Sequence, residues 1–173
     1  MNAAERRKAI WEILQEQEGP VSATALARQL HVSRQIIVGD VALLRASNHA
    51  ISATPRGYIV EAGGGPGLRR TIACRHDWET GLREELYTIV DNGAGVLDVT
   101  VEHPVYGQLS GQLQLFSRYD VDDFIRRLAQ DDAQPLSCLT GGVHLHTILC
   151  ADEAMYQRVL KQLEEKGILL TKE

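Results

Sequence analysis

The segment that most constrains the fold is residues 62–67, in which five of six residues are Gly or Pro. Such a stretch favours a flexible connection over a helix or a paired strand. About 61 residues precede it and about 106 follow, and each part is long enough for a small core of its own. We therefore predict two domains, residues 1–62 and 69–173, joined by a Gly/Pro linker at 63–68.

The bulk composition limits where such a chain works. Apolar residues make up 44% of it, but no run reaches the roughly 18 apolar residues of a membrane span. The N-terminal segment carries Glu5 and Glu12 among its positive charges and has no cleavage pattern, so we expect no signal peptide. Three widely spaced cysteines favour reduced thiols. We expect a cytoplasmic protein that does not bind membranes.

The charge is uneven along the chain, although the net charge is −5. Residues 1–61 carry seven Lys/Arg against six Asp/Glu, whereas residues 62–173 carry eleven against seventeen. A nearly neutral front half and an acidic back half are expected if only the front half meets a polyanion.

The front half has the outline of a winged helix-turn-helix. Apolar residues recur at helical spacing in residues 4–17, 23–30 and from 34 onward, and Ser22 and Ser33 are suited to cap the second and third helices. Two short extended segments, 50–53 and 57–60, flank the turn-prone sequence Thr54-Pro55-Arg56. A tight helix pair followed by a hairpin predicts a DNA-binding head, with a protein-binding three-helix domain as the alternative.

The third helix would be the recognition helix, whose N-terminal residues reach base edges. Arg binds guanine through two hydrogen bonds and Gln does the same with adenine, so these residue types suit base readout. Other polar and basic residues could hold phosphates and so set the register on DNA. The expected DNA-binding residues are Ser22, Ser33, Arg34, Gln35, Arg45 and Arg56.

The back half alternates between strand and helix patterns. The expected order is strand, helix, strand, strand, helix, strand, helix, at residues 71–76, 79–91, 96–102, 108–116, 120–130, 142–150 and 152–166. This order predicts an α/β (α+β) domain with a split β-α-β sandwich of the ferredoxin-like kind.

Two histidines lie in the last expected strand. Because residues i and i+2 of a strand face the same side, His144 and His146 should point together and could share one divalent ion. Further ligands could come from His76 and from Glu84 or Glu85, between which the spacing does not decide. His and carboxylate ligands suit zinc, nickel or iron. An isolated His-x-His is otherwise more often structural.

His103 opens the loop His103-Pro104-Val105-Tyr106-Gly107, just after an expected strand. It is either a turn residue before Pro104 or a pocket residue near the metal, and the sequence favours neither.

Longer strings resemble a known family. The string VSATALARQLHVSRQIIVGDVALLR is similar to the helix-turn-helix of biotin-repressor-like regulators. The strings TPRGYIV, RHDWETGLREELYTIVDNG, VEHPVYGQL and PLSCLTGGVHLHTI resemble bacterial repressors of niacin metabolism, in which a three-histidine (3H) domain follows a winged helix. The resemblance covers nearly the whole chain.

The resemblance implies a transcriptional repressor of NAD-precursor uptake or synthesis, with nicotinic acid or a related pyridine carboxylate as co-repressor. It also implies a bound transition metal held by His76, Glu84, His144 and His146. A ligand beside the metal would be walled by the loop that contains His103 and Tyr106. Such a repressor would bind operator DNA as a homodimer, because one head contacts too few bases for useful specificity.

Two other classes of function compete with this expectation. The same side chains could form a hydrolytic zinc site, although no HExxH-type motif is present and a DNA-reading head is attached. Alternatively, the back half could be a metal-stabilised dimerisation module. We expect a regulator and not an enzyme.

Overall fold

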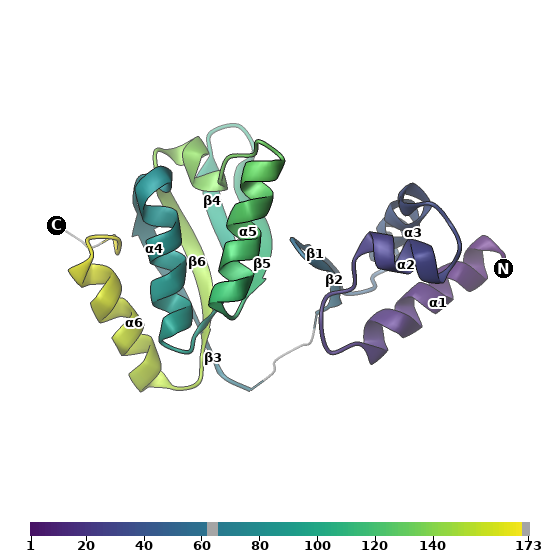
Figure 1. The fold of residues 1–173 in the computed structure, drawn as a ribbon, viewed down its shortest axis with the longest axis horizontal. Helices are drawn as coiled ribbons and strands as arrows, with labels where there is room; N and C mark the ends of the chain where they lie inside the picture. The colour runs from purple at the N-terminus through teal and green to yellow at the C-terminus, as the bar shows by residue number, and fades with distance from the viewer. Residues whose placement is uncertain (62–65, 171–173) are drawn as a thin grey trace. The chain divides into compact units, whose positions relative to one another are not determined.

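A computed structural model describes residues 1–61 and 66–170 (Figure 1). The chain divides into two compact units, Met1–Gly65 and Pro66–Glu173. Half of the expected linker, residues 63–65, lies outside the described residues. None of the described helices has the length and apolar character needed to cross a membrane.

The N-terminal unit contains three helices and a hairpin. The elements are α1 (Ala3–Glu16), α2 (Ala23–Gln29), α3 (Arg34–Ala46), β1 (Ile51–Thr54) and β2 (Gly57–Val60). As expected, Ser22 and Ser33 cap α2 and α3, each accepting a hydrogen bond from a backbone N–H of the first turn. The hairpin pairs antiparallel with Thr54 opposite Gly57. The helix-turn-helix with a β-hairpin wing is confirmed.

The core of this unit is apolar. One side chain set from all three helices and from β1 fills it, comprising Ile10, Leu14, Leu26, Ile37, Val41, Leu44 and Ile51. Asp40 is a buried charge, and it is paired with Arg6 and Arg7 at the side of the core. The exposed residues at the start of α3, which were expected to contact DNA, lie outside this core.

The C-terminal unit is one antiparallel sheet with helices. Its elements are β3 (Leu68–Arg75), α4 (Trp78–Asp91), β4 (Gly95–His103), β5 (Gly107–Leu115), α5 (Arg118–Gln130), the short 3₁₀ helix η1 (Leu136–Thr140), β6 (Val143–Cys150) and α6 (Glu153–Glu165). The strand order is β3-β6-β4-β5. The strands β3 and β4, which α4 connects, are separated by β6, so the split β-α-β arrangement is confirmed.

Three helices cover one face of this sheet. In Figure 1, α4 lies between α5 and α6 in front of the strands. The residues of β6 alternate between the two faces: His144, His146 and Ile148 are buried beneath the helices, whereas Val143 and Leu145 are partly exposed on the other face. The strand that carries the two histidines thus delivers them into the helix-covered core.

Candidate metal centre

A buried polar cluster in the C-terminal unit contains His76, His144 and His146, and Glu85 lies at its centre. Its side chain is fully buried, and three imidazole nitrogens approach its carboxylate. His76 Nε2 lies 3.0 Å and His144 Nε2 lies 2.9 Å from Oε2, and His146 Nε2 lies 2.6 Å from Oε1. The expected convergence of the three histidines is therefore present in the structure.

The carboxylate that they meet is Glu85 and not Glu84. The Glu84 side chain is 52% exposed, and its Oε1 lies 3.9 Å from Lys166 Nζ. Glu85 shares the buried face of α4 with Leu86 and Ile89, because Ile89 follows it by four residues. The helix is rotated so that this face packs on the sheet, which turns Glu84 toward solvent. The choice of Glu84 for this position is corrected.

The local backbone brings His76 into the cluster. His76 follows the last residue of β3, and two glycines border it at distances that leave no room for a side chain. A Cβ at Gly81 of α4 would lie 2.5 Å from the His76 Cβ, and a Cβ at Gly142 would lie 2.4 Å from the His76 carbonyl oxygen. Gly142 also has φ +96°, which other residues rarely adopt. Both glycines are needed for this close packing.

Each histidine uses its other ring nitrogen to bind a backbone carbonyl. Nδ1 lies 3.0 Å from the Asp77 oxygen in His76, 2.8 Å from the Gly142 oxygen in His144 and 2.7 Å from the Asp98 oxygen in His146. A carbonyl only accepts hydrogen bonds, so each Nδ1 carries the hydrogen. In the neutral ring, Nε2 then presents a lone pair.

If all three rings were neutral, the lone pairs of three Nε2 atoms would face a carboxylate that also only accepts hydrogen bonds, and these contacts would be repulsive. A positive charge must lie between them, supplied either by protons or by a metal ion. Burial disfavours the charged forms of His76 and His146, but Glu85 outweighs burial and raises the pKa of each. Burial likewise disfavours the Glu85 carboxylate, yet His146, His144 and His76 together hold the pKa of Glu85 well below its usual range. The cluster is thus electrostatically suited to a cation.

A buried ring nitrogen of His76 also fits a metal. His76 Nε2 is buried and, despite its proximity to Glu85, has no hydrogen-bond partner of acceptable geometry in residues 1–61 and 66–170. A buried nitrogen without a hydrogen bond is costly, and coordination to a cation would satisfy it.

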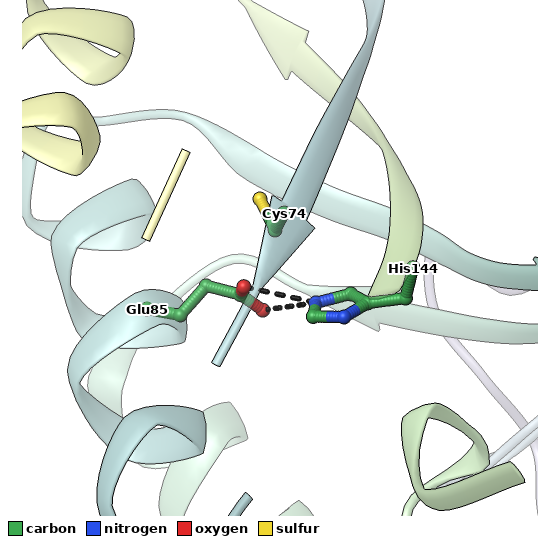
Figure 2. A group of neighbouring side chains, drawn as sticks. All are labelled: Cys74, Glu85 and His144. Carbon is green, nitrogen blue, oxygen red and sulfur yellow. Dashed lines mark hydrogen bonds and ion pairs between the residues drawn. The ribbon is translucent and has the colours of Figure 1, made fainter. Parts of the chain in front are cut away.

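Cys74 adds a sulfur beside the cluster. It is the cross-strand partner of His144, and donor atoms of Cys74, Glu85 and His144 all lie within 4.8 Å of one another (Figure 2). Burial, and then the Glu85 carboxylate, raise the pKa of the Cys74 thiol, so it is neutral in the absence of a metal. No short-range sequence pattern indicated that Cys74 belongs to this group, because strand pairing alone brings it to His144.

A pocket of about 660 Å³ borders the cluster on the side of His76. It lies between the start of α4 and the connection from η1 to β6, and its lining includes Arg75, His76, Trp78, Ser137 and Gly142. Of these, the sequence had singled out only His76.

The two residues expected to wall a ligand pocket lie elsewhere. His103 ends β4, and its Nδ1 accepts hydrogen bonds from the backbone N–H groups of Val105 and Tyr106. The Tyr106 side chain is 75% exposed, and neither His103 nor Tyr106 lines the pocket beside His76. Their contact with a ligand stays a prediction.

The residues expected to bind DNA all lie in the N-terminal unit, and their contact with DNA stays a prediction. Ser33, Arg34 and Gln35 are exposed at the start of α3, and Arg45 is exposed near its end. Ser22 caps α2, and Arg56 lies in the turn between β1 and β2.

The winged helix-turn-helix, followed by a separate α/β domain, places this protein in the class of DNA-binding regulators. Comparison with known proteins agrees: an HTH domain model matches residues 6–59, and a 3H domain model matches residues 69–172. The chain is 45% identical over 166 residues to the probable transcription repressor NiaR of Thermotoga maritima, covering 96% of this chain and 94% of the relative. It is 42% identical over 170 residues to the transcription repressor NadR of Bacillus subtilis, with the same coverage.

The chain therefore belongs to the 3H-domain family of transcription repressors. Membership in a family of repressors sets aside the hydrolase alternative.

Proposed function

We propose that this protein is a metal-dependent repressor of genes for NAD-precursor uptake or synthesis, with nicotinic acid as its co-repressor. The observation that carries the metal requirement is the orientation of His76, His144 and His146. Each ring donates a hydrogen bond through Nδ1 to a backbone carbonyl, so that all three Nε2 atoms face the Glu85 carboxylate. This is the ligand and outer-shell arrangement that protein metal sites use.

The proposed ligands are His76, Glu85, His144 and His146. Three imidazoles and one carboxylate suit zinc, nickel or iron, and the bound ion would supply a fixed positive charge and an open coordination position. The backbone carbonyls of Asp77, Gly142 and Asp98 would orient the histidine ligands, and burial of Glu85, His144 and His146 would exclude water from the cluster.

The metal is tested by elemental analysis of the full-length protein. The double substitution His144→Ala, His146→Ala is expected to abolish bound metal, because it removes two of four donors. A matched control is His49→Ala in the N-terminal unit, where the ring binds the Leu44 carbonyl instead. Metal content in the double variant equal to that of the parent would refute these ligands.

DNA binding is proposed for the exposed start of α3. Ser33, Arg34 and Gln35 would contact base edges, while Ser22, Arg45 and Arg56 would hold phosphates. A homodimer would place two heads on half-sites one helical turn apart, roughly 34 Å, or a multiple of it. The ligand must favour one arrangement of the heads, since a ligand with equal affinity for both arrangements changes nothing.

The co-repressor is tested by operator binding at fixed salt, because phosphate contacts make affinity salt-dependent. Nicotinic acid is expected to tighten binding by the metal-loaded protein, and not by the His144→Ala, His146→Ala variant. If nicotinic acid leaves the affinity of the metal-loaded protein unchanged, the effector assignment fails. A metal-stabilised dimerisation module would show metal-dependent dimers without any ligand response.

A further inference from the structure

We propose that the pocket beside His76 is a receptor for an aromatic carboxylate, and that Arg75 selects the acid over the corresponding amide. This inference rests on the proposed function, which it deepens by assigning the ligand's charged group to a side chain. The pocket's volume of about 660 Å³ lies within the range that small-molecule sites occupy, roughly 300–1,000 Å³.

Arg75 provides the positive charge. Arg75 is one of the residues that line the pocket, and its guanidinium makes no ion pair or side-chain hydrogen bond with any residue that the structure describes. By contrast, two other arginines of this unit are paired: Arg83 with Asp122, and Arg118 with Asp91. A guanidinium without an ion-pair partner can bind a planar carboxylate through two parallel hydrogen bonds.

The opposing charge in the lining is Asp77, which is already engaged. Its carboxylate caps α4 by accepting a hydrogen bond from the Glu79 backbone N–H. The positive end of the 14-residue helix α4 also lies at this point, next to Trp78. The pocket therefore retains a site for a negative group on the Arg75 side.

Trp78 provides an aromatic surface. It is the first residue of α4, and 37% of it is exposed although it is large and apolar. A planar ring packed against the indole would bury surface that now contacts water. Gly141 and Gly142 complete the lining without side chains, which leaves room for a flat molecule.

Selection follows from donor and acceptor chemistry. A guanidinium has only donors, and a carboxylate offers acceptors at both oxygens, whereas a carboxamide turns one NH₂ donor toward it. A site built to bind one group rejects the analogue that leaves its own polar group unpaired.

The experiment is calorimetric titration of the full-length, metal-loaded protein with nicotinate, nicotinamide, benzoate and benzamide. The benzoate pair lacks a ring nitrogen and so reports the carboxylate apart from metal ligation. The parent is expected to prefer each acid over its amide by about tenfold or more. Arg75→Gln should weaken acid binding by about 10- to 100-fold and leave amide binding unchanged.

Two control variants separate charge recognition from packing. Arg69→Gln removes an exposed arginine at the other end of β3, outside the pocket lining, and should change neither acid nor amide binding. Trp78→Ala should weaken the acid and the amide alike. Retained acid preference in Arg75→Gln, or no preference in the parent, would overturn the inference.

The test distinguishes this inference from the proposed function. Metal content and operator binding without effector should be the same in Arg75→Gln as in the parent. If nicotinate binds through Arg75 but does not alter operator affinity, the co-repressor assignment fails while the carboxylate receptor stands.

Discussion

The two units bury different kinds of groups. The N-terminal unit packs an aliphatic centre, with Ile10, Leu26 and Ile37 fully buried; it pairs its buried Asp40 with arginines and keeps its proposed DNA contacts on the surface. The C-terminal unit places Glu85, His144 and His146 inside its core. In the first unit, the proposed DNA contacts lie apart from the residues of the core, whereas in the second the proposed metal ligands are themselves part of the core.

Chelation of the metal should show the largest difference between the units. Removing an ion that is present at 100 to 1,000 times its dissociation constant costs roughly 3–4 kcal/mol of stability. That loss is expected in the C-terminal unit alone, measured by calorimetric unfolding with and without a chelator. Glu85→Gln should remove the response to chelator, because a neutral amide does not replace the anionic ligand. Equal loss in both units would show that the ion is not held by the cluster.

A cavity in the aliphatic core should have the next largest effect. Leu26→Ala is expected to lower the stability of the N-terminal unit by about 3 kcal/mol, because Leu26 is fully buried. Metal content should not change, as elemental analysis would check. A drop in bound metal would contradict the separation of the two cores.

At the surface of the N-terminal unit, Arg34→Ala should affect binding and leave folding intact. The expected cost is about 1–3 kcal/mol of operator affinity, with relaxed base preference at one position. Binding measured on a set of single-base operator variants would detect this. Equal loss on every sequence would indicate a phosphate contact instead.

The smallest effect is expected at Glu84, which is the matched control for Glu85. Glu84→Gln removes an exposed carboxylate 3.9 Å from Lys166, a contact worth less than about 1 kcal/mol. Metal content and the response to chelator should equal those of the parent. Loss of metal in this variant would restore Glu84 as the ligand.

Local patterns in the sequence determined much of this molecule. Capping serines and apolar spacing predicted the winged helix, and strand alternation correctly placed His144 and His146 on one face. These signals are available from sequence because each arises between residues a few positions apart.

The choice between Glu84 and Glu85, and the approach of Cys74 and Arg75 to the cluster and its pocket, depended on tertiary structure. Two adjacent helix residues point about 100° apart, so the rotation of α4 against the sheet decides which one is buried. That rotation is set by packing of Leu86 and Ile89 on strands distant in the chain. Likewise, Cys74 meets His144 only because β3 pairs with β6, an alignment between segments about seventy residues apart that no short-range pattern encodes.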